Sequence, residues 1–178
     1  MVGLGLSFFF AFLSFALEAE LLIGPKGILP LDNFMHRLSR NSGGGAFTPG
    51  FDAFWTHLKK WPTLTWFSAD LSFLYALSAA GMIAALLLAF GVLPGFLSLV
   101  LWCLYLSITI AGQRFYYFQW DNLILEVGLL SACLLPFVAL RAKRVHVARL
   151  SIFFFAFLLL KIVLSSAMAK WNSGDNSW

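Results

Sequence analysis

Long apolar stretches recur along the chain and alternate with short segments that carry polar residues, glycine and proline. Five stretches are each long enough to cross a hydrocarbon core of about 30 Å as a helix that rises about 1.5 Å per residue. They cover residues 4–23, 71–90, 93–111, 120–140 and 150–169. The pattern therefore predicts an all-α protein, a polytopic transmembrane helical bundle of about five spanning helices that forms a single helical membrane domain over residues 1–178.

The segment 24–68, between the first two spans, is predicted to be a loop outside the membrane. Residues 41–50 read as a flexible Gly/Ser/Pro linker. Thr48 and Pro49 then suit the N-cap and first position of a short helix. Its apolar positions recur at i, i+3, i+4 and i+7, as Phe51, Phe54, Trp55 and Leu58. Two interpretations stay open: an interfacial helix in the lipid headgroup region, or a cap packed over the bundle.

Composition supports a membrane protein and argues against soluble classes. The 178 residues are 61% hydrophobic and 11% charged, whereas soluble domains are about 25% charged. Mean hydropathy is +0.86. The net charge of +4 comes largely from short loop clusters, so it bears on orientation and lipid headgroups, and we expect the lipid bilayer rather than nucleic acid as the partner.

Orientation follows from the short basic loop 141–149, which contains Arg141, Lys143, Arg144 and Arg149. By the positive-inside rule this loop is cytoplasmic, which places the N-terminus in the cytoplasm and the C-terminus outside or in a lumen. The basic residues of segment 24–68 disagree, but long loops count less in this rule.

A cleaved signal peptide is the competing interpretation of the first stretch. No Lys or Arg precedes that stretch, and Glu18 and Glu20 stand where small residues should mark a cleavage site. The sequence therefore favours an uncleaved first transmembrane helix.

Three charged residues are expected inside the spans. Measured from the cytoplasmic edge, Lys161 lies at about 17 Å, Glu18 at about 21 Å and Glu126 at about 20 Å. We expect a buried polar layer in which Lys161 pairs with Glu126 or Glu18, because an unpaired charge at this depth is costly. The alternative is that the lysine snorkels toward an interface and the carboxylates are hydrated without a function.

The polar face of the fourth span is also predicted from helical spacing. Gln119, Asn122 and Glu126 fall on one stripe at i, i+3 and i+7, which we expect to face inward, whereas Asp121 points away from it. Asp121, Asp70 and Arg114 are expected near the outer boundary, where an exposed ion pair contributes under about 1 kcal/mol.

No pattern in the sequence assigns a catalytic residue, a metal or a cofactor. The three histidines are isolated in sequence, and Cys103 and Cys133 lie inside apolar spans without CxxC spacing. Neither a Gly-rich phosphate loop nor a nucleophile elbow is present, so the sequence favours a non-enzymatic protein and leaves the question open.

Four motifs, in order along the chain, resemble the membrane portion of the lipase maturation factor family. LIGPKGILP at 22–30 is similar to the family's LIG-x-x-GILP, and WPTLTWFSAD at 61–70 to its PTLFW followed by Ser-Asp. FQWDNLILEVGLL at 118–130 resembles FQWD-x-LLLE-x-GFLA, and KIVLSSAMAKWNSGDNSW at 161–178 resembles R-x-ML-x-SG-x-x-K-x-x-SGD-x-x-W. The family-motif positions are Gly24, Gly27, Pro30, Pro62, Asp70, Gln119, Trp120, Asp121, Glu126, Gly128, Lys170, Gly174 and Asp175.

The resemblance also has departures. Lys161 stands where the family has Arg, Ala167 where it has Gly, and Glu18 where it has Gln. Family members continue past the last motif into further membrane segments and a large extracytoplasmic region, so the chain resembles an N-terminal fragment of such a protein.

The resemblance implies a chaperone-like membrane protein that assists the maturation of secreted proteins such as lipases, with a lipase as its client. The alternative is a membrane enzyme or carrier for a lipid-soluble molecule, which would use the layer of Glu18, Glu126 and Lys161. Compact loops favour the bacterial inner membrane, and the endoplasmic reticulum membrane is expected if the protein is eukaryotic. The sequence does not fix the oligomeric state.

Overall fold

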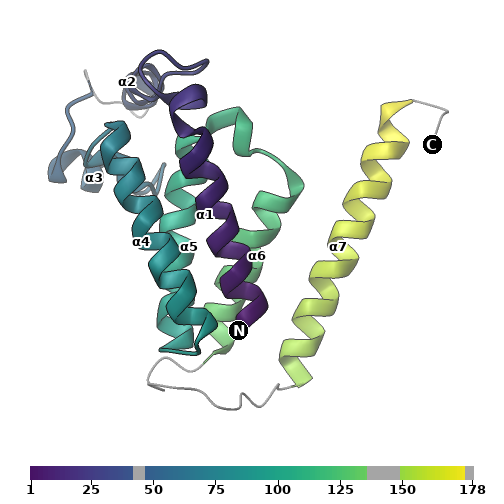
Figure 1. The fold of residues 1–178 in the computed structure, drawn as a ribbon. Helices are drawn as coiled ribbons and strands as arrows, with labels where there is room; N and C mark the ends of the chain where they lie inside the picture. The colour runs from purple at the N-terminus through teal and green to yellow at the C-terminus, as the bar shows by residue number, and fades with distance from the viewer. Residues whose placement is uncertain (42–46, 136–148, 175–178) are drawn as a thin grey trace. The chain divides into compact units, whose positions relative to one another are not determined.

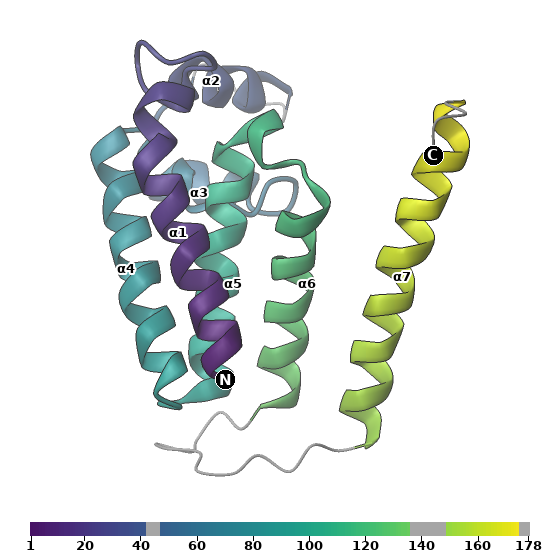
Figure 2. The same cartoon turned by 45° about the vertical axis from the view of Figure 1, so that its right-hand side comes forward.

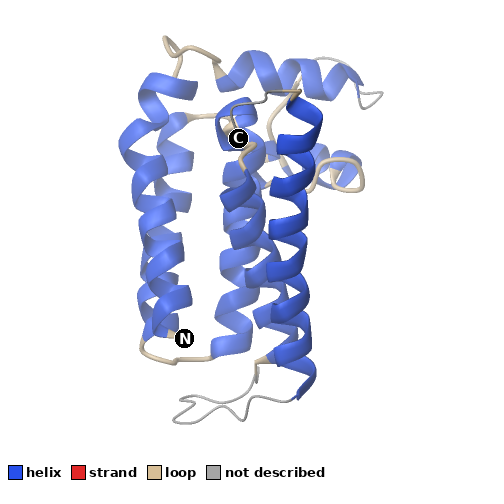
Figure 3. Ribbon diagram, turned by 90° about the vertical axis from the view of Figure 1, so that its right-hand side faces the viewer, coloured by secondary structure: helices blue, strands red, loops and turns tan. Residues whose placement is uncertain are grey.

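A computed structural model describes residues 1–41, 47–135 and 149–174, and all regular structure among them is helical (Figure 3). The prediction of an all-α protein is therefore confirmed. In chain order the elements are α1 (Val2–Ile23), α2 (Leu31–Asn41), α3 (Phe51–His57), the 3-10 helix η1 (Leu64–Trp66), α4 (Leu71–Ala89), α5 (Pro94–Ala111), the 3-10 helix η2 (Gln113–Tyr116), α6 (Gln119–Leu134) and α7 (Arg149–Ser173).

The chain divides into two units, Met1–Lys143 and Arg144–Trp178, and each is described by itself. The second unit contains the long helix α7. A single domain over the whole chain stays a prediction.

The first unit is a bundle in which α1, α4, α5 and α6 run side by side (Figures 1 and 2). Met1 and the turn between α4 and α5 lie at one end, and α2 lies across the other end (Figure 2). Its core contains buried aromatic and aliphatic side chains from α1, α2, α4 and α5, including Phe8, Phe12, Leu74 and Leu101. A buried core of this kind fixes the helices that carry the candidate site.

Small residues allow α1 and α4 to approach closely. A Cβ atom added at Gly5 of α1 would lie 2.6 Å from the carbonyl oxygen of Ala85 and 2.9 Å from the Cβ of Ala89. Two further glycines receive phenylalanine rings of α1, Gly81 that of Phe12 and Gly128 that of Phe8. Close backbone approach through small residues is typical of helices that pack in lipid, where apolar burial alone does not drive association.

Four described helices are long and apolar enough to cross a membrane: α1, α4, α5 and residues Ser151–Ser173 of α7. The prediction of a helical membrane bundle is therefore confirmed. The predicted fourth span, 120–140, corresponds to α6, which has 16 residues and ends at Leu134. Leu135 is extended, with φ −91° and ψ 149°, because a proline follows it in the sequence and disfavours the α conformation. The rest of that span, and the basic loop up to residue 148, lie outside the described residues.

Within segment 24–68, the structure contains a helix that the sequence analysis missed. α2 buries Leu31, Met35, Leu38 and Ser39, at i, i+4, i+7 and i+8. This spacing is that of an amphipathic helix, so periodicity was the signal that would have revealed it. Its other face carries polar side chains, among them Asp32 and Arg40.

The short helix α3 begins at Phe51, whereas the sequence predicted a start at Pro49 with Thr48 as the cap. Gly50 occupies the N-cap position with φ 155°, and its N–H donates to the Trp66 carbonyl, so this glycine sets the start. The Phe54 ring stacks on Phe67 at a centroid distance of 4.7 Å, whereas Phe51 is 63% exposed. Of the apolar side chains on α3, some therefore pack against the protein and others are exposed. The interfacial helix stays a prediction.

Candidate functional site

The candidate site is a cavity of about 460 Å³ between α1, α5, η2 and α6, which we call the α1–α6 cavity. All of its described lining residues belong to the first unit. On α1 they form one stripe at i, i+4, i+7, i+11 and i+15: Ser7, Ala11, Ser14, Glu18 and Leu22. α1 buries the neighbouring stripe in the core, about 100° further around the helix, and its cavity stripe carries the polar side chains.

The buried end of the cavity is formed by Tyr105 of α5 and Asp121 of α6. The Tyr105 hydroxyl donates a hydrogen bond of 2.8 Å to Oδ1 of Asp121. Tyr105 is 1% exposed and Asp121 is 4% exposed. The bond therefore joins buried side chains of α5 and α6, where a satisfied polar pair stabilises one arrangement of the helices.

Phenylalanine side chains hold the Tyr105 ring in place. Phe8 and Phe12 of α1 meet it edge to face, at centroid distances of 5.9 and 5.6 Å and interplanar angles of 82° and 81°. Edge-to-face pairs contribute about 0.5 to 1.5 kcal/mol beyond their buried area. A single tyrosine thus connects α1, α5 and α6.

The second carboxylate oxygen of Asp121 takes no part in the bond to Tyr105. This atom, Oδ2, is buried and has no hydrogen-bond partner among the described residues. The residue lies in the first turn of α6, where the free N–H groups of the helix stabilise a carboxylate by about 0.3 to 1 kcal/mol. This favourable position offsets part of the cost of burying the carboxylate.

Tyr116 of η2 lines the cavity next to these groups and lies outside the spanning segments. Burial raises the pKa of Tyr116 far above its usual value, and the carboxylates of Glu18 and Asp121 raise it further. The Tyr116 phenol is therefore neutral at physiological pH and can donate a hydrogen bond within the cavity.

The residues of the predicted polar layer come from three helices, α1, α6 and α7. Glu18 lines the α1–α6 cavity, and Glu126 is half-buried on α6. Lys161 is in the second unit, on α7. Its pairing with Glu126 or Glu18 stays a prediction.

The predicted orientation of α6 was wrong. Gln119 and Asn122 are exposed, whereas Asp121 faces the core and is hydrogen-bonded to Tyr105. Helical spacing correctly separates Asp121 from the other stripe, but it does not say which stripe faces the bundle. Asp121, which was expected near the outer boundary where an ion pair would be exposed, is instead 4% exposed. Sequence reasoning missed Tyr105, which had no charge or motif to mark it.

The motif at residues 22–30, which contains Gly24 and Gly27, forms the turn that follows α1. The Gly27 N–H donates to the Gly24 carbonyl at 2.9 Å, and the Leu29 N–H donates to the Leu22 carbonyl at 2.9 Å. Nε2 of Gln113 donates to the Leu29 carbonyl at 3.1 Å, which ties the turn to η2. Pro30 directly precedes α2. These motif positions shape the backbone and contribute no reactive group.

The motif at residues 61–70 connects segment 24–68 to α5 by hydrogen bonds. Thr63 and Thr65 share a hydrogen bond of 2.8 Å, and the Leu64 N–H donates to the Ser107 hydroxyl at 3.0 Å. Pro62 is exposed. Asp70, also exposed, precedes α4 and accepts a hydrogen bond from Ser68 at 2.8 Å.

The remaining family-motif residues lie in α6 and near the end of α7. Trp120 is exposed and stacks on Phe118 at 4.8 Å. Gly174 adopts φ 65° directly after α7, a left-handed conformation that is common where helices end. Lys170 is exposed in the last turn of α7, and Asp175 lies outside the described residues.

The polar groups of the cavity are carboxylates, which accept hydrogen bonds, and hydroxyl groups, which can also donate them. Its described lining residues offer the carboxylates of Glu18 and Asp121 and the hydroxyl groups of two serines and two tyrosines, with no His, Cys or Lys among them. Over the described part of the chain, no group of three His, Cys, Asp or Glu residues is placed to hold a metal ion. The arrangement therefore suits a cation or a hydrogen-bond donor.

Comparisons with known proteins agree with the motifs. The family model for the lipase maturation factor transmembrane domain matches residues 1–178. Lipase maturation factor 2 of Xenopus laevis is 32% identical over 186 residues, which cover 99% of this chain and 25% of that protein. The Homo sapiens lipase maturation factor 2 is 32% identical over 193 residues, with 99% and 26% covered.

Lipase maturation factor 1 of Bos taurus is 30% identical over 182 residues, with 99% of this chain and 31% of that protein covered. The chain thus spans between a quarter and a third of the length of these curated relatives. No solved structure matches the chain significantly.

Proposed function

This chain belongs to the lipase maturation factor family, and we propose that it forms a membrane-embedded part of a factor that assists the maturation of secreted lipases. The observation that carries the proposal is the family match over residues 1–178. A multi-pass membrane protein fits the four apolar helices that are long enough to span a bilayer.

We infer a non-catalytic, assembly-type role for the bundle. The Tyr105–Asp121 bond and the phenylalanines around it act as a lock between three helices, which supports a rigid platform. Such a platform would hold the outer segment, with α2 and α3, in a fixed position relative to the membrane. A secreted lipase is the client that the family implies.

One observation favours the alternative, a carrier or enzyme for a lipid-soluble molecule. The α1–α6 cavity is lined by Glu18. A purely structural layer predicts instead that Glu18, Glu126 and Lys161 bond to each other and leave no pocket. Family membership supports the assembly role, and we keep it as the conclusion.

We propose that the N-terminus is cytoplasmic and the C-terminus lies on the opposite side, an orientation supported by the basic residues of 141–149. The relatives reported above come from vertebrates, which supports the endoplasmic reticulum membrane as the compartment. The bacterial inner membrane, favoured by the compact loops, gains no support from them.

A chimera tests the function directly. The matching portion of bovine lipase maturation factor 1 is replaced by this chain, and the chimera is expressed in cells that lack their own factor. The activity of a secreted lipase is measured relative to the total lipase protein. We expect activity above the vector level, and a chimera that accumulates in the membrane without restoring activity would contradict the proposal.

Variants of the chimera separate the two roles. Glu18→Gln removes a carboxylate of the cavity, and Glu20→Gln is the matched control because Glu20 is an exposed carboxylate of α1 that does not line the cavity. The assembly role predicts equal lipase activity for both variants. A loss in Glu18→Gln at unchanged protein abundance would favour the carrier or enzyme.

A further inference from the structure

A second groove, of about 510 Å³, lies between α2, the C-terminal part of α5, η2 and α6, and we call it the α2–α5 groove. All of its described lining residues belong to the first unit. It is distinct from the α1–α6 cavity, since Tyr116 is the only described residue that lines both.

The floor of the groove is apolar. Leu106 and Ile110 of α5 and Leu125 of α6 contribute to it. Both α5 residues lie in the last turns of a helix that is long and apolar enough to span a bilayer. We therefore expect the floor to lie just inside the hydrocarbon region, where an acyl chain would contact it.

The polar part of the groove is basic. Arg37 of α2 and Arg114 of η2 both line it, and no Asp or Glu is among its described lining residues. Asn41, Gln113 and Asn122 add amide groups that can donate hydrogen bonds. The local charge is thus positive, with hydrogen-bond donors around it.

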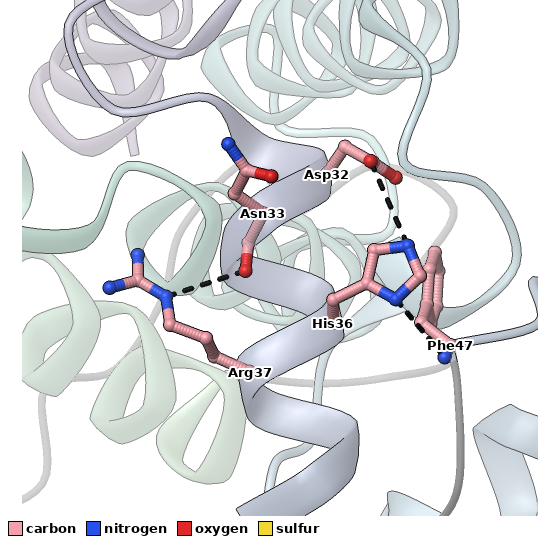
Figure 4. A network of polar contacts seen from close by, with 5 residues as sticks. All are labelled: Asp32, Asn33, His36, Arg37 and Phe47. Carbon is pink, nitrogen blue, oxygen red and sulfur yellow. Dashed lines mark hydrogen bonds and ion pairs between the residues drawn. The ribbon is translucent and has the colours of Figure 1, made fainter.

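A local hydrogen bond restrains the Arg37 side chain at the groove. Nε of Arg37 donates to the Asn33 carbonyl at 3.4 Å, on the side of α2 away from the contacts of His36 with Asp32 and Phe47 (Figure 4). That bond leaves the terminal amino groups of the guanidinium available to a ligand.

Arg114 follows a residue with a constrained backbone. Gln113 has φ 53°, a left-handed conformation that is uncommon for a residue other than glycine, and its side chain is hydrogen-bonded to Leu29. The backbone before Arg114 is therefore fixed in one conformation.

Aromatic side chains mark the groove as a boundary site. Trp61 and Tyr117 line it and are exposed. Trp and Tyr concentrate at the level of the lipid headgroups, between hydrocarbon and water. An amphiphile at this depth would place its headgroup at the arginines and its chain along the floor.

We propose that the α2–α5 groove binds an anionic phospholipid, whose phosphate group is bound by Arg37 and Arg114 and whose acyl chain lies along Leu106, Ile110 and Leu125. Guanidinium groups bind phosphate oxygens through paired, charge-assisted hydrogen bonds. A zwitterionic lipid fits less well, because the groove offers no described carboxylate to its ammonium group. This inference does not depend on the proposed function.

Lipid retention tests the proposal. The full chain is purified from membranes, exchanged into nanodiscs of phosphatidylcholine with phosphatidylglycerol, extracted into detergent and analysed by native mass spectrometry. The variants are Arg37→Gln, Arg114→Gln and the double variant. Arg40→Gln is the matched control, because Arg40 is an exposed arginine on α2 that does not line the groove.

We expect wild type and Arg40→Gln to retain phosphatidylglycerol in preference to phosphatidylcholine. Each groove variant should lower retention about fivefold, since a basic residue near a membrane contributes about 1 kcal/mol to anionic lipid binding. Thermal unfolding in phosphatidylcholine nanodiscs checks that each variant folds, and the single variants carry the test if the double variant does not.

Three results would overturn the proposal. One is equal retention of phosphatidylglycerol by wild type, Arg37→Gln and Arg114→Gln. Another is equal retention of phosphatidylcholine and phosphatidylglycerol by the wild type. Displacement of the bound lipid by inorganic phosphate alone would also contradict it, because the acyl chain would then contribute nothing.

Discussion

Replacing Tyr105 by Phe removes one hydroxyl group from the centre of the bundle and keeps the ring. The ring contacts with Phe8 and Phe12 are retained, so the loss comes from the 2.8 Å bond to Asp121. A hydrogen bond to a charged group contributes about 1.5 to 3 kcal/mol to stability. Because Oδ2 of Asp121 already has no described partner, Tyr105→Phe leaves both carboxylate oxygens without one. We expect the free energy of unfolding to fall by about 1.5 to 3 kcal/mol.

The assay is reversible unfolding in mixed micelles of a mild detergent and sodium dodecyl sulfate, followed by tryptophan fluorescence. Tyr75→Phe is the matched control, since Tyr75 lies on α4 and is exposed. Exposed substitutions change stability by under about 0.5 kcal/mol. If Tyr105→Phe and Tyr75→Phe unfold at the same denaturant concentration, the buried bond contributes nothing and the proposed lock is refuted.

A double-mutant cycle separates the bond from the cost of an orphaned partner. Asp121→Leu leaves the Tyr105 hydroxyl buried without its acceptor, which costs about 1 to 3 kcal/mol. In Tyr105→Phe/Asp121→Leu neither group is left without a partner, so the double variant should be more stable than the sum of the single effects predicts. The expected coupling is at least about 1 kcal/mol. Strict additivity would mean that the two side chains do not interact.

Three further predictions concern packing, the polar layer and orientation. Gly81→Ala should lower the free energy of unfolding by about 1 to 3 kcal/mol, because its Cβ would lie 2.6 Å from a phenylalanine ring of α1. Gly3→Ala is the control and should have no such effect, because the space around Gly3 is open. Thermal unfolding in detergent compares the two variants. If Lys161 pairs with Glu126, Lys161→Met and Glu126→Gln should each reduce protein abundance and the double variant should recover it, whereas unaffected single variants would exclude the pair. A glycosylation acceptor placed in segment 24–68 should be modified in microsomes if that segment is lumenal, and an unmodified acceptor, beside a modified lumenal control, would reverse the orientation.

The apolar runs of the sequence were sufficient to predict the long helices. The predicted bounds of the first span, 4–23, and of the third, 93–111, lie within two residues of α1 and α5. An apolar run of this length has few alternatives to a helix in a bilayer, because its backbone N–H and C=O groups must form hydrogen bonds within the protein. The length of apolar runs does not reveal α2, because α2 is a short amphipathic helix whose buried positions are interspersed with polar residues.

The candidate site was harder to predict than the helices. A charge inside a span is visible in the sequence, and Glu18 does line the cavity. The side of a helix that faces its neighbours depends on partners far away in sequence, as Asp121 shows by facing Tyr105. Tyrosine in an apolar run carries no signal of its own, so the hydrogen bond that joins the helices could not be inferred from either residue alone.

The packing of α1 against elements that come much later in the chain has a consequence for biosynthesis. Gly5 contacts α4 at Ala85, about 80 residues further on, and Phe8 contacts Tyr105 and Gly128, later still. At about 5 to 20 residues per second, roughly 4 to 16 s pass before the ribosome has made that part of α4. During that interval α1 is inserted without its partners, with Glu18 exposed to whatever surrounds it. The first helix to enter the membrane is therefore among the last to be enclosed, and nascent chains that stall before α5 would present it to the factors that recognise unassembled membrane helices.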